Sequence, residues 1–447
     1  MDFSVSKVFH PVGQGLFSSA TLRVDGEDTS KDYVWVYDCG NHWAQPLVMR
    51  EVDRFASAHT AIDMLVISHF DADHISGVSR LIGKSPTRRI MLPYMDLAQR
   101  LILAFDQGLT GAEEIAGFYL NPAAYLAEQA GDPSIEFLFV PPSSPDGPPT
   151  VPGEDVAPTP DGFLPYGDMH RDAETKSGIL RETVEYSEPI PEAFGPEINA
   201  MRHSQIGTSG YLPKIAMLRQ RGRIVVERLW EFIPYNDPLP KPRNLRLFSK
   251  EVERSRDRLL TATSDKDREE RIQQLKQLYD KHLSGRRTSD KRNRGSLFLF
   301  EGPLHVIKVH ACALLWPATF PGHPRPVTAI LQHCLAPICT TRTARSFMMT
   351  GDGFLKKSSE LDNLKRYFGP ARMADILALQ VMHHGSRYNW HKGIANDISP
   401  SFSIFSADPS RQRPGHPSPV VLADFKRFNP MIADQHDGIL VCASYLR

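Results

Sequence analysis

The stretch from Met64 to His74, MLVISHFDADH, contains the residues that decide the fold and the chemistry of this chain. Its apolar run from Met64 to Ile67 is typical of a buried strand. The polar segment His69 to His74 follows directly and holds two imidazoles and two carboxylates within six residues. Such a cluster after a strand predicts a metal site, whereas a polar turn that caps the next helix would explain the aspartates alone.

The alternation of side chains at a strand end predicts that His69 and Asp71 face the same way. Asp73 and His74 can then face a neighbouring metal, so that one loop offers two partial ligand sets. Apolar residues follow at helical spacing: Ile75, Val78, Leu81 and Ile82. The cluster is therefore expected where a strand leads into a helix, which is a common place for sites in α/β sheets.

Other apolar runs also predict strands that lead into polar loops. Those before the cluster are Thr21 to Val24 and Tyr33 to Tyr37. Those in the second half of the chain are Ser296 to Phe300, His305 to Leu315, Val327 to Leu335, Ser346 to Met349 and Ile376 to Met382. Residues that can carry chemistry again follow several of these runs, which favours an α/β protein with its site at strand ends.

The composition is that of an ordinary globular protein, with 41% hydrophobic and 23% charged residues among 447. This length fits one large α/β domain with insertions as well as two or three domains. Lysine plus arginine equals aspartate plus glutamate at 52 each, so the molecule as a whole does not attract polyanions. Any binding of nucleic acid must be local.

The cysteines are odd in number and show no CxxC spacing, which favours free thiols in a reducing compartment. They are Cys39, Cys312, Cys334, Cys339 and Cys442. The first residues do not form a signal peptide, and no stretch reaches about 18 apolar residues. We therefore expect a cytoplasmic protein that does not enter a membrane.

Two segments in the middle of the chain have unusual compositions. The range 141–165 contains nine prolines, which predicts a loop or tether that could carry a flap over a cleft. The range 241–294 contains 17 Lys or Arg against 9 Asp or Glu, with Ile272, Leu275 and Leu278 on one helical stripe. A solvated surface helix with i,i+4 ion pairs is favoured there over a contact with nucleic acid.

The run at His69 resembles HxDxDH, a variant of the HxHxDH signature of the metallo-β-lactamase superfamily. Further segments are similar, in the same order, to the hydrolase domain of the DNA-uptake protein ComEC. They are Val12 to Gly15 (VGQG), Tyr37 to Gly40 (a DxG turn), Thr350 to Asp352 (TGD), His383 to Ser386 (HHGS) and Gly415 to Ser418 (GHPS). These ordered matches support the metal site, and Asp71, which the ComEC-like branch shares, narrows the resemblance to that branch.

The resemblance covers about residues 1–95 and 345–447, with a shorter similarity at 293–300, and leaves about 96–290 unexplained. Pro11 stands where the family usually has Asp, and Asp71 replaces the second His of the superfamily at large. The fold implied is an αββα sandwich with a large, partly helical and Pro-rich insertion. Its implied parts are an N-terminal half (1–95), the insertion (96–292) and a C-terminal half (293–447).

Carried over by position, the resemblance implies six metal ligands: His69, Asp71, Asp73, His74, Asp352 and His383. The first metal would take His69, Asp71 and one of His383 or His416, the second Asp73 and His74, and Asp352 would bridge both. Implied catalytic residues are Asp73, His384 and His416, and implied substrate contacts are Gly385 and Ser386. The division of roles among the last three histidines stays open.

Two divalent metal ions are the expected cofactors. Because Asp71 adds a carboxylate, the site favours manganese or magnesium without excluding zinc. Structural or surface roles are expected for the other histidines considered: His10, His203, His305, His310, His333 and His391.

The function expected from the resemblance is hydrolysis of phosphodiester bonds in DNA or RNA by a metal-activated water. A protein partner could deliver the substrate. The alternative is a small-molecule phosphodiesterase or esterase of the cyclic-nucleotide or phosphocholine type, which suits the zero net charge. A binding subunit that keeps the metals only for structure is the least favoured reading.

Overall fold

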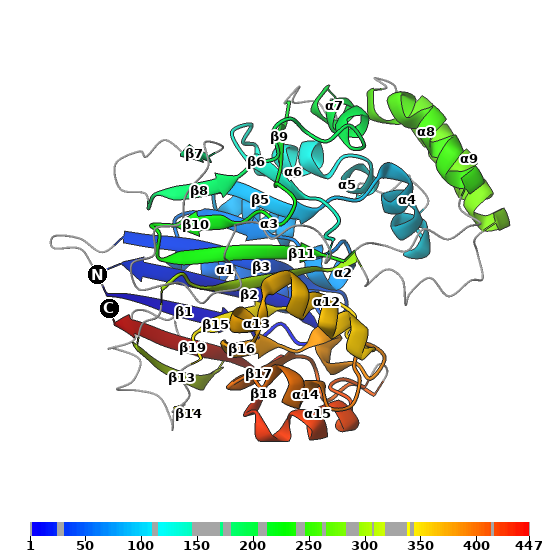
Figure 1. The fold of residues 1–447 in the computed structure, drawn as a ribbon. Coiled ribbons are helices and arrows are strands. Elements are labelled where there is room, and N and C mark those ends of the chain that lie inside the picture. Colours follow the sequence, from blue (N-terminus) through cyan, green and yellow to red (C-terminus); the bar gives the residue numbers. More distant parts are fainter. Residues whose placement is uncertain are drawn as a thin grey trace.

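The computed structural model describes residues 2–24, 31–109, 115–144, 170–172, 180–203, 212–237, 246–261, 265–282, 295–305, 308–317, 338–339, 344–412 and 415–446. These segments form two large mixed β-sheets with helices on their outer sides (Figure 1). The α/β class predicted from the sequence is confirmed.

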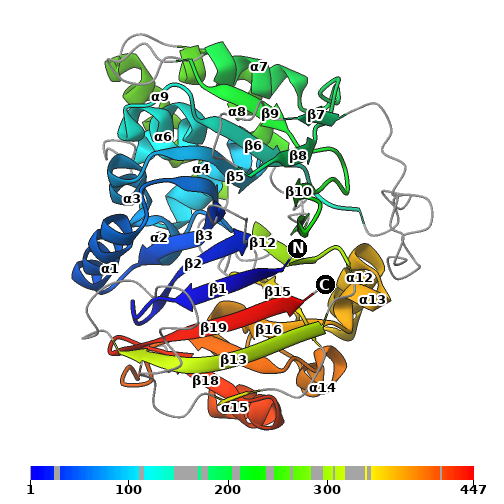
Figure 2. The same cartoon turned by 90° about the vertical axis from the view of Figure 1, so that its left-hand side faces the viewer.

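The first sheet joins the two ends of the chain. In spatial order it contains β14 (Ile338–Cys339), β13 (Lys308–Pro317), β19 (Asp437–Leu446), β1 (Phe3–Phe9), β2 (Gly15–Val24), β3 (Lys31–Asn41), β4 (Ile62–Val66), β5 (Thr87–Pro93), β6 (Glu136–Val140) and β9 (Lys214–Met217). β1 pairs antiparallel with β19, so the termini lie side by side (Figures 1 and 2). In this sheet β3, β4, β5, β6 and β9 run parallel.

The second sheet faces the first. In spatial order it contains β18 (Pro430–Ala433), β17 (Phe402–Ser406), β16 (Ile376–Gln380), β15 (Ser346–Met349), β12 (Leu297–Pro303), β11 (Trp230–Asn236), β10 (Ile224–Val226), β8 (Glu182–Glu185) and β7 (His170–Asp172). The strands from β15 to β18 run parallel. Their carboxyl ends therefore lie at the same edge of the sheet.

Three apolar cores show how the layers are stacked. The core between the sheets contains residues of both, such as Trp35 of β3 and Phe232 of β11. A second core packs helices on the outer face of the first sheet: α1 (Gln45–Ala58), α3 (Val78–Lys84), α4 (Leu97–Asp106), α5 (Ala116–Leu120), α6 (Pro122–Ala130), α7 (Gly195–His203), α8 (Arg246–Thr261) and α9 (Asp265–His282). A third packs helices on the second sheet: α12 (Ser358–Phe368), α13 (Pro370–Met373), α14 (Ile394–Ile398), α15 (Pro419–Asp424) and the 3-10 turn η4 (Phe425–Arg427).

The strands predicted from apolar runs are present, with shifted ends. The runs Thr21 to Val24 and Tyr33 to Tyr37 lie inside β2 and β3, and the run from Met64 lies in β4. The later runs correspond to β12, β13, β15 and β16, whereas Val327 to Leu335 lies outside the described residues.

The helical spacing after His74 corresponds to two short helices, α2 (Ala72–Ile75) and α3, and not to one. Gly77 lies between them and donates its backbone N–H to the carbonyl of Cys39 at 2.8 Å. A Cβ on Gly77 would come within 2.4 Å of the Val48 side chain. The helix is therefore interrupted where the chain packs closely against β3 and α1.

The middle range 96–292 contributes strands to both sheets. β6 and β9 extend the first sheet, and β7, β8, β10 and β11 extend the second. The boundaries of the insertion at residues 95 and 292 stay a prediction. The described strands of this range belong to the two sheets and do not form a separate domain. The expected Pro-rich flap lies outside the described residues from residue 145 onward.

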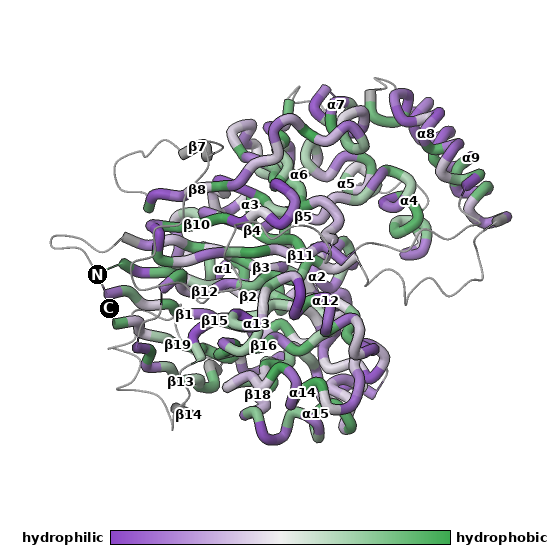
Figure 3. The backbone as a smooth tube through the Cα atoms, in the orientation of Figure 1, coloured by the Kyte–Doolittle hydropathy of each residue, from purple (hydrophilic) through white to green (hydrophobic). Residues whose placement is uncertain are grey.

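The described part of the basic segment, residues 246–261 and 265–282, forms the paired helices α8 and α9, which project from the same side of the molecule as α2 and are largely hydrophilic (Figures 1 and 3). Ile272 and Leu275 are buried, and Leu278 packs against them. The exposed surface carries ion pairs such as Lys276 with Asp280 at 2.5 Å. This is the arrangement expected of a surface helix with i,i+4 pairs.

Among the described helices, none combines the length and the apolar character needed to cross a membrane. The described cysteine side chains, Cys39, Cys312 and Cys442, are free thiols and are buried.

Candidate metal centre

The carboxyl ends of strands from both sheets meet at one edge of the sandwich. β4 leads to His69, β15 leads to Asp352, and β16 leads to the 3-10 turn η3 (Met382–Gly385). The carbonyl of Ser68 accepts a hydrogen bond from the backbone of Leu297 at 2.8 Å, which joins the two sheets here. The loops that follow these strands are therefore held within reach of one another, as expected for a site at strand ends.

Two overlapping groups of side chains could each hold a metal ion. Within each group, the candidate ligand atoms all lie within 4.8 Å of one another. The first group is Asp73, His74, Asp352 and His384. The second group is His69, Asp71 and Asp73. Five of the six residues expected as metal ligands, and His384, are thus brought together in the described part of the chain.

Asp352 lies at the centre of the cluster, with each carboxylate oxygen facing two imidazoles. Oδ1 lies 3.1 Å from Nε2 of His74 and 3.6 Å from Nε2 of His384. Oδ2 lies 3.5 Å from Nε2 of His383 and 3.8 Å from Nε2 of His69. A carboxylate can use its two oxygens separately, so this geometry suits a bridge between two cations.

Three imidazoles are oriented by hydrogen bonds at Nδ1 that leave Nε2 facing the cluster. His74 bonds to Asp38 at 2.7 Å, and His384 bonds to the carbonyl of Ser406 at 2.6 Å. The hydroxyl of Ser68 donates to Asp38 and therefore accepts from Nδ1 of His69 at 2.9 Å. The same orientation, with the outer nitrogen donating, is typical of histidines that bind metals.

Two buried ring nitrogens have no hydrogen-bond partner among the described residues. They are Nε2 of His69 and Nδ1 of His416. Burial lowers the pKa of each imidazole to about 3, so both are neutral near pH 7. A buried polar atom without a partner costs free energy, which makes each nitrogen a candidate position for a ligand.

The charges of the cluster suit cation binding. Burial opposes the charged form of His74, but Asp352 and Asp38 raise its pKa well above the usual value. Burial also opposes ionisation of Asp352, yet His383, His74 and His384 lower its pKa well below the usual range. A metal bound to His74 would displace this proton, because the ligand form is the neutral ring.

Asp38 is a candidate supporting residue of the cluster that the sequence does not single out. It belongs to the DxG turn of the sequence, is fully buried and contacts both His74 and Ser68. Its backbone is left-handed, with φ of 57°. The carboxylate of Asp38 thus fixes the ring of His74, a candidate ligand, and, through Ser68, the ring of His69.

We expect Asp38→Asn to weaken metal binding or activity by about 10- to 100-fold, the usual effect of losing such a partner. Asn tolerates the left-handed backbone, so the fold should persist. Metal affinity measured by isothermal titration calorimetry checks this. The matched control is Asp63→Asn, because Asp63 also accepts a backbone N–H, from Val34 at 2.8 Å, but contacts no ligand. Equal affinities of the two variants would contradict the role of Asp38.

Side chains from the middle range support the ligand loop from outside. Gln107 donates to Oδ1 of Asp71 at 3.2 Å, and the Tyr119 hydroxyl donates to the carbonyl of Phe70 at 2.8 Å. Tyr279 of α9 bonds to Asp106, next to Gln107. The resemblance does not cover these residues, and no local signal in the sequence marks them.

The turn that carries His383 and His384 has an unusual backbone. Both residues are left-handed, with φ of 45° and 55°, and Gly385 follows with φ of 81°. Each left-handed non-glycine residue costs about 1 kcal/mol or more. The surrounding contacts hold this turn in place, including the bond from His383 N to the Gly351 carbonyl at 3.0 Å.

The remaining expected site residues lie at the edge of the cluster. The ring of His416 lies 5.7 Å from that of His383 and 6.5 Å from that of His384. Gly385 and Ser386 are buried, and the Ser386 hydroxyl accepts the backbone N–H of Tyr388 at 3.3 Å. Their part in substrate binding stays a prediction, while their contacts here stabilise the turn.

Nothing in the comparisons with known proteins bears on this cluster. No protein-family model matches the chain, and no curated protein matches it significantly.

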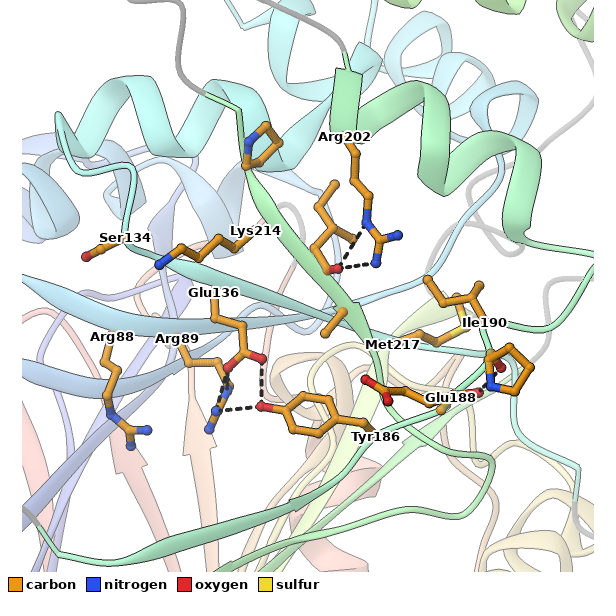
Figure 4. A pocket seen from close by; sticks show the side chains of 15 residues that line it. Arg88, Arg89, Ser134, Glu136, Tyr186, Glu188, Ile190, Arg202, Lys214 and Met217 are labelled. Atoms are coloured by element: carbon orange, nitrogen blue, oxygen red, sulfur yellow. Dashed lines mark hydrogen bonds and ion pairs between the residues drawn. The ribbon is translucent and has the colours of Figure 1, made fainter. Parts of the chain in front are cut away.

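A cavity of about 910 Å³, drawn in Figure 4, is lined by none of the residues of the cluster. It is lined at the starts of the parallel strands β5, β6 and β9, whereas the cluster follows strand ends. Arg89 in its wall is bonded to Glu136 at 2.7 Å and to Tyr186 at 3.2 Å (Figure 4). The cavity and the cluster therefore lie at opposite ends of the strands, and this guanidinium is held by partners within the protein.

Proposed function

We propose that the chain is a metal-dependent hydrolase of the metallo-β-lactamase fold, in its ComEC-like branch, that cleaves phosphodiester bonds in DNA or RNA. Two stacked sheets between layers of helices support the fold. The observation that carries the function is the position of Asp352, whose two oxygens each face two imidazoles. This is the geometry that a dinuclear centre requires.

The residues present fit two divalent cations. The candidate ligands are His69, Asp71, Asp73, His74, Asp352, His383 and His384. Three carboxylates make the set rich in oxygen, which suits manganese or magnesium as well as zinc. When bound, such ions supply a water of lowered pKa and stabilise charge on the attacked group and the leaving oxygen.

The chain's own residues hold the reacting groups in position. Asp38 and the carbonyl of Ser406 fix the rings of His74 and His384. Asp73 lies 3.3 Å from Nε2 of His384, so its carboxylate is held toward the centre. His416 is neutral near pH 7, and its buried Nδ1 has no hydrogen-bond partner among the described residues, so it is a further candidate ligand atom at the edge of the cluster.

The test is cleavage of labelled single- and double-stranded DNA and RNA with manganese, magnesium or zinc. We expect metal-dependent products that chelation with EDTA abolishes and that Asp73→Asn reduces by about 10³-fold or more. Cyclic nucleotides and phosphocholine esters are tested alongside. Turnover of these small substrates alone would overturn the choice of nucleic acid, and no hydrolysis with any divalent metal would overturn the enzyme.

A further inference from the structure

Two aromatic side chains are exposed on segments that are hydrogen-bonded to the chain close to His74 and His384. The large apolar side chains that are exposed in the described part of the chain are Trp43, Leu212, Leu247, Leu315, Tyr388, Val420 and Leu446. The two aromatic ones are Trp43, 62% exposed, and Tyr388, 54% exposed. Single exposed aliphatic residues need no explanation, but two exposed rings on the loops of one site indicate binding.

Trp43 is tied to the ligand loop by short hydrogen bonds. Its backbone N–H donates to Oδ1 of Asn41 at 2.7 Å, and the Asn41 backbone donates to the hydroxyl of Ser76 at 3.0 Å. Ser76 lies two residues after His74. The guanidinium of Arg411 lies over the Trp43 ring, 4.4 Å from its centroid. Arg411 comes from the loop that leads to His416.

Tyr388 is likewise hydrogen-bonded to the chain beside the cluster and contacts an arginine, here on the loop that follows His384. Its backbone N–H donates to the hydroxyl of Ser386, which directly follows the turn of His384 and Gly385. The guanidinium of Arg387 lies 5.0 Å from the centroid of the Tyr388 ring and donates to its hydroxyl at 2.9 Å. Each exposed ring is thus paired with an arginine.

The loops that leave the cluster are basic, although the whole chain carries equal numbers of basic and acidic residues. The loops 353–357, 386–393 and 407–412 contain one acidic residue, Asp408. Their basic residues are Lys356, Lys357, Arg387, Lys392 and Arg411. A local positive charge beside the cluster favours binding of phosphates.

We propose that Trp43 with Arg411 and Tyr388 with Arg387 form a stacking platform for single-stranded DNA or RNA beside the metal centre. This rests on the proposed function and names its substrate class. Aromatic rings accept the faces of unpaired bases, and arginines add cation–π contacts and bind phosphates. Bases inside a duplex are already stacked and cannot offer their faces, so the platform selects single strands.

The test measures binding without hydrolysis. Full-length protein in EDTA is titrated into labelled oligo(dT) and oligo(rU) of about 12 nucleotides, a length that spans a typical single-strand site, and into a duplex of equal length. Fluorescence anisotropy gives Kd. We expect Trp43→Ala and Tyr388→Ala to weaken single-strand binding about 10-fold each. Trp43→Phe and Tyr388→Phe keep a ring and should bind nearly as the wild type does.

Leu247→Ala is the matched control, because Leu247 is 64% exposed but lies on the basic helix α8. We expect no change in its Kd. Arg411→Gln should weaken binding. It should also reduce the slope of log Kd against log salt concentration by about 1, the contribution of one phosphate contact.

The outcomes separate the platform from the proposed function. Unchanged binding by both alanine variants overturns the platform even if metal-dependent hydrolysis is found. Equal affinity for the duplex, or no binding of any oligonucleotide, also overturns it. Loss of binding in both variants supports the platform even if no phosphodiester is hydrolysed, in which case only the proposed function fails.

Discussion

Replacing Asp352 with Asn is expected to reduce the rate of hydrolysis by about 10³-fold or more and to lower the metal content below two ions per chain. Asn keeps the size of the side chain but loses its charge, and its NH2 group cannot bind a cation, so one of the two oxygens that face the imidazoles is lost. Four imidazoles lie within 4.0 Å of the Asp352 oxygens, so the loss of this carboxylate affects four candidate ligands at once. Metal content after dialysis, measured by mass spectrometry, checks the prediction.

The loss of metal should also appear in thermal unfolding. A metal that binds only the folded state raises Tm, so added manganese or zinc should stabilise the wild type and not Asp352→Asn. The control is Asp53→Asn, because Asp53 lies on α1, pairs with Arg80 at 2.8 Å and does not contact the cluster. If Asp352→Asn kept both ions and the full rise in Tm, the bridging role of Asp352 would be wrong.

The sequence predicted those parts of the fold that depend on short-range patterns. The apolar run before Ser68 and the run before His383 correspond to β4 and β16, because a buried strand needs continuous apolar residues. The ends of helices were harder to predict. The interruption at Gly77 depends on its close contact with Val48, which lies on another helix.

The sequence predicted most of the residues that the structure brings together in the cluster, but not the residues that support them. His69 and Asp73 belong to a recognisable run, whereas Gln107 reaches Asp71 from the turn that follows α4, in the unexplained middle range. Trp43 and Tyr388 were missed because exposure cannot be read from one aromatic letter. Residues that act through contacts between distant segments leave no local pattern, so only the folded structure brings them into view.

Gly40→Ala is expected to have the second largest effect, because it displaces the ligand loop without removing any ligand. A Cβ on Gly40 would lie 2.6 Å from the backbone carbonyl carbons of Asp73 and His74 and from the nitrogen of His74. These are backbone atoms of α2, so the helix itself must move. Overpacking of this kind lowers the free energy of unfolding by about 1–3 kcal/mol. A ligand shift approaching 1 Å can reduce activity about 10²-fold.

The backbone of Gly40 is not left-handed, so steric contact alone should produce this effect. Gly195→Ala is the matched control, since Gly195 also has an ordinary backbone and its Cβ would meet no atom within 4 Å. We expect that variant to stay within about 0.5 kcal/mol of the wild type. Urea unfolding and metal titration measure both variants. Wild-type metal affinity in Gly40→Ala would contradict the view that β3 holds the ligand loop in place, because the ligands would then tolerate a displaced α2.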